Sequence, residues 1–165
     1  MQHTLRLASA DDDGWQCAIY ASTRADELAL TGWSAAQCES FVRQQHQAQQ
    51  QHYRRHFPAS CCQLILVDGA VAGRLWVDRR DDRLHVLDIA LLPAFRNLGL
   101  GTRCLQALAD EAATTGRDVS IQVEIHNPAR RLYERLGFIA EGEPQGLHQP
   151  MRWHRAARVA EECLP

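Results

Sequence analysis

Lysine is absent from the sequence, and arginine supplies all 18 of its cationic side chains. We interpret this absence as a bias in the base composition of the source genome. An excess of positive charge is missing as well, because the formal net charge is −2. A protein that binds nucleic acid in general needs a basic stripe along its surface. The composition therefore indicates no nucleic-acid partner.

Long apolar runs are missing too, and none approaches the roughly 20 residues that a membrane span requires. The amino terminus reads Met-Gln-His-Thr-Leu-Arg, without the charged and apolar regions of a secretory signal. The cysteines form no Cys-x-x-Cys pair and show no metal-ligand spacing with histidine. We therefore expect a cytoplasmic protein with reduced thiols, no membrane partner and no metal. The cysteines are Cys17, Cys38, Cys61, Cys62, Cys104 and Cys163, and the adjacent pair 61–62 is expected to fill a core.

What is present suffices for one globular domain. The chain has 165 residues, of which 45% are hydrophobic, and a chain of this size can bury a full core. No internal repeat and no linker interrupts it. We therefore expect a single domain that spans residues 1–165.

The first half of the chain predicts a strand, two helices and three strands. Ser34-x-x-Gln37 is a capping-box pattern that starts the second helix. Asp68-Gly69 is a hairpin turn signal between two apolar runs. The expected elements are a strand at 3–8, a helix from about 11 to 28, a helix from Ser34 to before Pro58, and antiparallel strands at 62–67, 71–78 and 84–92.

The centre of the chain is the stretch 87–101, in which an apolar strand runs through Pro93 into Arg96-x-x-Gly99-x-Gly101 and then into a helix. Such a loop can turn several backbone N–H groups toward one point at the positive end of a helix, which suits a phosphate. The glycines allow a close approach of the backbone. A dinucleotide loop would need a third glycine where Cys104 stands. A tight helix start without a ligand is the other alternative.

The second half alternates helices with strands. A helix ends near Gly116, and the strand at 119–125 should lie parallel to the strand before the loop, because a helix crosses between them. Asn127-Pro128 predicts an N-cap followed by proline at the first helical position. Two last strands are expected at 138–140 and 149–155.

Two motifs give the chain a resemblance to the GNAT superfamily of N-acetyltransferases. The first is Leu91-Leu92-Pro93-x-x-Arg96-x-x-Gly99-x-Gly101, which is similar to the acetyl-CoA loop of that family. The second is Val123-x-x-x-Asn127-Pro128-Ala129-x-x-Leu132-Tyr133-x-x-x-Gly137-Phe138, which is similar to its asparagine and tyrosine helix. The resemblance implies a fold that combines helices and strands, α/β in the broad sense and α+β in the stricter one. Its mixed, mostly antiparallel sheet has six to seven strands with helices on both faces, in the order β-α-α-β-β-β-α-β-α-β-β.

The resemblance implies a role for each part of these motifs. The N–H groups of the loop, with Arg96, would hold the pyrophosphate of coenzyme A, and the preceding strand edge would pair with the pantetheine arm. An N–H near Leu91 would polarise the thioester carbonyl. Asn127 would bond the pantetheine amides, and Tyr133 would protonate the departing thiolate as general acid. The implied coenzyme-binding residues are Ile89, Leu91, Arg96, Asn97, Leu98, Gly99, Leu100, Gly101, Thr102, Asn127 and Tyr133.

Two of these residues have structural alternatives. Asn127 is a good N-cap whatever the function. Tyr133 lies on the apolar face of its helix and also fits a core tyrosine. The loop and the helix together favour the functional interpretation.

The chemistry also needs a base, because the attacking amine must lose a proton. His85 lies six residues before Leu91, where some family members carry a catalytic glutamate, and Glu124 precedes Asn127. Asp88 is a third candidate. Recognition of the acceptor is expected to use the turn from Glu27 to Trp33. For each ionisable residue the alternative is an exposed charge on a strand or helix, and for Trp33 it is a side chain of the core.

The predicted function is transfer of the acetyl group of acetyl-CoA to an amine of a small molecule or peptide, by direct attack within a ternary complex. The alternative is a module of the same fold that binds acyl-CoA as a sensor without transfer. A longer acyl-CoA is a further alternative for the donor. Homodimers are common in the family, and the sequence leaves a homodimer open.

Overall fold

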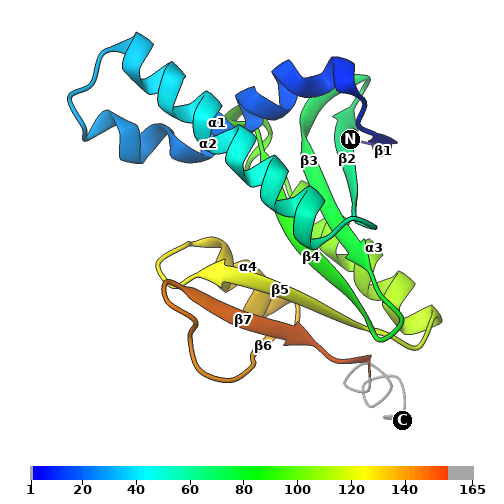
Figure 1. The fold of residues 1–165 in the computed structure, drawn as a ribbon. Helices are drawn as coiled ribbons and strands as arrows, with labels where there is room; N and C mark the ends of the chain where they lie inside the picture. The colour runs from blue at the N-terminus through cyan, green and yellow to red at the C-terminus, as the bar shows by residue number, and fades with distance from the viewer. Residues whose placement is uncertain (1, 156–165) are drawn as a thin grey trace. The chain divides into compact units, whose positions relative to one another are not determined.

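The computed structural model describes residues 2–155, so Cys163 and the expected domain end at residue 165 lie outside the described residues. The predicted order of helices and strands is confirmed (Figure 1). Short 3-10 turns at Ala10–Asp12 and Pro93–Phe95 add to it. The elements are β1 (His3–Leu7), α1 (Asp13–Ala29), α2 (Ala35–His56), β2 (Cys61–Val67), β3 (Ala70–Arg79), β4 (Arg83–Leu91), α3 (Leu100–Thr114), β5 (Asp118–Glu124), α4 (Ala129–Arg135), β6 (Ile139–Ala140) and β7 (His148–Trp153).

The strands form one seven-stranded sheet in the order β1-β2-β3-β4-β5-β7-β6. Strands β4 and β5 pair in parallel, with a register from Arg83↔Asp118 to Val86↔Ile121. The pairs β1–β2, β5–β7 and β6–β7 are antiparallel. The mixed, mostly antiparallel sheet and the parallel pair across a helical crossover are therefore confirmed.

The described residues form two compact units. The first unit contains residues 2–76 and 88–98, and the second contains residues 77–87 and 99–155. Strands β3 and β4 contribute residues to both units. The single domain over 1–165 stays a prediction, and we describe each unit by its own contacts.

In the first unit, α1 and α2 pack against each other as an antiparallel helical pair (Figure 1). The predicted capping box starts α2, because the Gln37 N–H donates to Ser34 Oγ at 3.3 Å and the Ser34 N–H donates to Gln37 Oε1 at 2.9 Å. The buried residues of α2 are Val42, His46 and Gln50, which recur every four residues on one face. Although α2 has 22 residues, no helix within 2–155 is both long and apolar enough to cross a membrane.

An ion pair between a buried arginine and a partly buried aspartate joins β3 to β4 in the first unit. The Arg74 side chain is 1% exposed, and its Nε donates to Asp88 Oδ2 at 2.6 Å. Its Nη2 donates to Gln49 Oε1 of α2 at 2.7 Å. The guanidinium therefore links two strands and a helix through groups that are 14 and 25 residues away in the sequence.

The two ends of β2 give one confirmation and one correction. Asp68 and Gly69 both adopt left-handed φ angles, 49° and 83°, as a two-residue hairpin turn requires. At the other end, Cys61 is exposed, so the prediction that it fills a core is wrong. It is the first residue of β2, and the fully buried residues of that strand begin only at Leu64. Cys62 is partly buried, and burial raises the pKa of its thiol to about 11.

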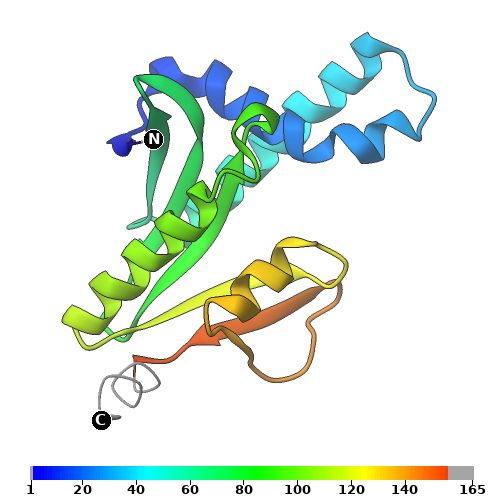
Figure 2. The same cartoon turned by 180° about the vertical axis from the view of Figure 1, so that it is seen from behind.

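In the second unit, α3 and α4 both pack against β5 (Figure 2). Helix α3 buries the apolar stripe that its spacing predicts, which includes Leu105, Leu108 and Ala112. Gly137 ends α4 with a φ of 91°, and a Cβ there would contact the Trp153 indole at 3.5 Å. The left-handed glycine therefore lets the chain turn from α4 toward β6 beside β7.

We predict that Asp88→Ala lowers the free energy of unfolding by about 3 kcal/mol, because it leaves the Arg74 guanidinium buried without its counter-ion. Glu39→Ala is the matched control, since Glu39 pairs with Arg43 at 2.9 Å on an exposed helix face. Removal of an exposed pair should cost less than about 1 kcal/mol. Denaturant unfolding of both variants measures the difference. Equal losses would contradict a structural role for the Arg74–Asp88 pair.

Candidate acetyl-donor site

The end of β4 presents one backbone edge away from β3. The Leu92 N–H donates to the Ala72 carbonyl of β3 at 2.8 Å. Because successive residues of a strand point their N–H groups to opposite edges, the N–H and C=O of Leu91 lie on the edge away from β3. The parallel ladder to β5 ends at Val86, so the strand continues past it through Ile89 to Leu91.

Arg96 fastens the loop that follows β4. Its Nε donates to the Leu91 carbonyl at 2.9 Å, and its Nη2 donates to the carbonyl and Oγ of Ser22 at 3.0 and 3.1 Å. Ser22 belongs to α1. The side chain predicted to contact a pyrophosphate thus also ties the loop to α1, through partners that the sequence did not reveal.

Two left-handed residues turn the chain from this loop into α3. Asn97 has a φ of 60°, and Gly99, the N-cap of α3, has a φ of 75° and a ψ of 7°. A left-handed residue followed by a helical one brings successive N–H groups together into a nest that suits an anion. Helix α3 starts at Leu100 without an acidic residue in its first turn. The N–H groups of Gly99, Leu100 and Gly101 therefore stand at a helix end with positive potential.

Gly101 brings the start of α3 close to α4. A Cβ at Gly101 would lie 3.5 Å from Leu132 Cδ2, so the absence of a side chain leaves room for this contact. Leu132 belongs to the helix that carries Tyr133. The two sequence motifs thus meet through Gly101 and Leu132 in the second unit.

The N-cap position of α4 is Pro128 and not Asn127 as predicted, but Asn127 bonds to the start of the helix. Its Oδ1 accepts a hydrogen bond from the Ala129 N–H at 2.9 Å, and its carbonyl accepts one from the Arg130 N–H at 3.1 Å. Helix α4 begins at Ala129, one residue later than expected, although Pro128 already has helical φ and ψ angles. The side-chain oxygen serves the helix, and the amide NH₂ group is the part of Asn127 that can donate to a ligand.

Tyr133 is 6% exposed, and its ring lies 5.9 Å from that of Phe138 at a tilt of 53°. The body of the side chain therefore belongs to the core of the second unit. A tyrosine with a buried ring can still present its hydroxyl to a ligand. The core packing and the predicted role as general acid are compatible.

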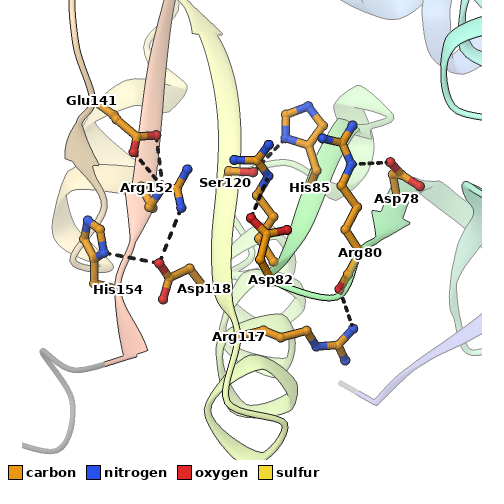
Figure 3. A network of polar contacts seen from close by, with 11 residues as sticks. Asp78, Arg80, Asp82, His85, Arg117, Asp118, Ser120, Glu141, Arg152 and His154 are labelled. Carbon is orange, nitrogen blue, oxygen red and sulfur yellow. Dashed lines mark hydrogen bonds and ion pairs between the residues drawn. The ribbon is translucent and has the colours of Figure 1, made fainter.

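His85 bonds to the neighbouring strand. Its Nδ1 lies 2.8 Å from Ser120 Oγ, and the two residues are direct partners in the β4–β5 ladder (Figure 3). Burial, followed by the positive charges of Arg80 and Arg83, lowers the pKa of His85 from its usual 6.5 to about 4. The imidazole is therefore neutral at physiological pH, and this neutrality was not visible in the sequence.

Glu124 ends β5, and its carbonyl accepts the Asn127 N–H at 2.9 Å. Ser120, the partner of His85, lies four residues earlier on the same strand, which is roughly 13 Å at 3.3 Å per residue. The structure therefore does not bring the two base candidates together, and they are alternatives. Asp88, the third candidate, is held by Arg74 in the ion pair described above.

The predicted acceptor residues separate in the structure. Glu27 pairs with Arg24 at 3.2 Å on the exposed face of α1. Trp33 packs edge-on against Phe41, with ring centroids 5.3 Å apart, and lines a groove of about 650 Å³ between α1 and α2. Glu27 does not line this groove. The sequence signal that could have revealed it is a row of small residues on α1, namely Ala18, Ala21, Ala25 and Ala29.

Residues 2–155 contain no group of three or more His, Cys, Asp or Glu side chains that could hold a metal ion. The polar network of Figure 3 contains carboxylates paired with arginines or with His154, the His85–Ser120 contact and a bond from Arg117 to the Arg80 carbonyl. Arg152, for example, lies between Glu141 and Asp118, at 2.9 and 3.5 Å.

Solved structures share this fold. The PaiA N-acetyltransferase from Thermoplasma acidophilum, determined in complex with coenzyme A, is 16% identical and matches with a TM-score of 0.70 over 93% of this chain and 99% of that one. The spermidine N-acetyltransferase from Vibrio cholerae, in complex with CoA and spermine, is 16% identical. It matches with a TM-score of 0.65 over 96% of this chain and 98% of that one.

Two sequence comparisons agree with the fold. An N-alpha-acetyltransferase of Sulfurisphaera tokodaii is 42% identical over 57 residues, which span 33% of this chain and 34% of that relative. The profile of the Acetyltransferase (GNAT) family matches residues 27–138, which include both motifs. The chain belongs to the GNAT acetyltransferase family.

Proposed function

We propose that the protein transfers the acetyl group of acetyl-CoA to an amine of a small molecule or peptide. The observation that carries this proposal is the left-handed Gly99 at the start of α3, directly after the loop that follows β4. This turn gathers N–H groups at a positive helix end, as an anionic coenzyme requires. The names of the relatives described above agree in one respect, which is that each is an N-acetyltransferase.

Each part of the donor site has a proposed task. The pyrophosphate is bound by the N–H groups from Asn97 to Thr102, including those of Leu98, Leu100 and Gly101, and by Arg96. The pantetheine arm pairs with the strand edge at Ile89–Leu91, and the Asn127 amide donates to it. The orientation of the Leu91 N–H away from β3 supports its use to polarise the thioester carbonyl.

The proposed reaction is a direct attack within a ternary complex. The amine nitrogen forms a bond to the acetyl carbon, and the carbon–sulfur bond breaks. The amine gives up a proton to a base, and the Tyr133 hydroxyl donates a proton to the thiolate that leaves. The products are an acetylated amine and free coenzyme A.

His85 and Glu124 are the proposed alternatives for the base. The pKa of about 4 keeps His85 neutral at physiological pH, so the ring is ready to accept a proton but holds it weakly. Glu124 lies beside Asn127 at the end of β5. On the acceptor side, Trp33 and Glu27 are proposed to contact the amine substrate, with Glu27 suited to a cationic group.

We predict that Tyr133→Phe lowers the rate of acetyl transfer about 100-fold, because general-acid catalysis contributes roughly this much. A panel of amines, with acetyl-CoA as donor and a thiol reagent as readout, measures the change. Tyr53→Phe is the control, since Tyr53 is a half-buried tyrosine that packs on Trp76 with ring centroids 4.8 Å apart. Undiminished turnover by Tyr133→Phe would refute its assignment as general acid. Donor binding without turnover on any amine would favour the sensor alternative.

A second prediction concerns the charge of His85. Between pH 4 and 6.5 the unfolded chain protonates this histidine and the folded protein does not. The free energy of unfolding should therefore rise with pH across this window and gain nothing further from His85 above it. In His85→Gln this contribution disappears, so the rise should be shallower. Unfolding curves at several pH values test the prediction, and identical pH dependence of the two proteins would show that His85 is not held neutral.

A further inference from the structure

The last turns of α2 carry two histidines on one face. His52 and His56 are four residues apart, and side chains with this spacing are neighbours on a helix surface. Their ring centres lie 4.5 Å apart, and the ring planes are tilted by 42°. Both side chains are exposed. The two imidazoles are therefore close to each other and accessible to an ion from solvent.

The ring nitrogens of this pair have no other task in the described part of the chain. Within residues 2–155, neither histidine makes a hydrogen bond or an ion pair, and their contacts are with other rings. His46 on the same helix differs, because its Nε2 lies 3.2 Å from Gln50 Nε2. Neutral imidazole is the commonest metal ligand in proteins, so two such rings side by side suit a metal ion.

The distance between the rings fits one shared ion. A metal about 2.0 Å from an imidazole nitrogen lies about 3.2 Å from the centre of that ring. Two ring nitrogens at 90° around the metal, as at adjacent octahedral or square-planar positions, place the ring centres about 4.5 Å apart. A tetrahedral angle would place them about 5.2 Å apart. The 4.5 Å between His52 and His56 therefore favours an ion such as Ni²⁺ over a tetrahedral one.

The charges around the pair act in both directions. His56 is the last residue of α2, where the negative end of the helix dipole stabilises a cation. Arg54 and Arg55 lie in the same last turn and oppose this effect. Arg54 is two residues from each histidine, so it points away from the pair. Arg55 lies three residues after His52 and is the cation that weakens binding.

We propose that His52 and His56 form a surface site for a divalent transition-metal ion such as Ni²⁺, with water at its remaining positions. This pair is a two-ligand site, and it is distinct from the groups of three or more side chains that residues 2–155 lack. The inference does not depend on the proposed function, because neither histidine has a task in acetyl transfer.

The test is titration calorimetry of Ni²⁺ into the full-length protein without an affinity tag. His52→Ala and His56→Ala should each weaken the site about 100-fold, because a second linked ligand contributes roughly this factor. His148→Ala is the control, since His148 is also exposed but lies on β7. Nickel sites elsewhere on the chain are shared by all four proteins and cancel in the comparison.

A further variant tests the spacing with the number of histidines unchanged. Gln51→His combined with His52→Ala places the two imidazoles five residues apart, on different sides of the helix, so the site should be lost. Melting temperatures give an independent readout, because an ion that binds only the folded protein raises the Tm. Nickel should raise the Tm of the wild type and of His148→Ala more than that of the other variants. Equal nickel affinity and equal Tm shifts in all five proteins would overturn the inference.

Discussion

The left-handed backbone at Gly99 is the constraint on which the donor end of the protein depends. Gly99 turns the chain from the loop after β4 into α3. A residue with a Cβ would be strained at its φ of 75°. The same glycine leaves space for the Arg103 guanidinium. One backbone angle therefore brings successive N–H groups together at the positive end of α3.

Strand β4 contributes residues to both compact units. In the first unit, the ion pair of Asp88 with Arg74 fixes the strand against β3 and α2. In the second unit, the parallel ladder fixes Arg83–Val86 against β5 and places His85 beside Ser120. His85 and Leu91 thus lie on a strand that is held at both ends.

Local signals in the sequence were sufficient for most of the fold. The Ser34–Gln37 capping box, the Asp68-Gly69 turn and the apolar stripe of α3 each involve residues close together in the chain. They are read from periodicity and turn chemistry, and the structure confirms them. The two motifs also located the glycine turn, and they located the start of α4 to within one residue.

Properties that arise from contacts between distant residues could not be predicted in this way. The low pKa of His85 depends on burial and on two arginines, and the Arg74–Asp88 pair joins positions 14 residues apart. The prediction that Cys61 is buried failed for a related reason, because the residue type alone does not determine whether other elements cover the end of a strand.

The central claim is acetyl transfer to an amine, and mass spectrometry of a mixture tests it most directly. The wild-type protein is incubated with acetyl-CoA and a set of polyamines, amino acids and short peptides. The account predicts an acetylated amine and free coenzyme A in equal amounts, in quantities that exceed those of a reaction without protein. Bound acetyl-CoA that is recovered intact, with every amine unmodified, would contradict it.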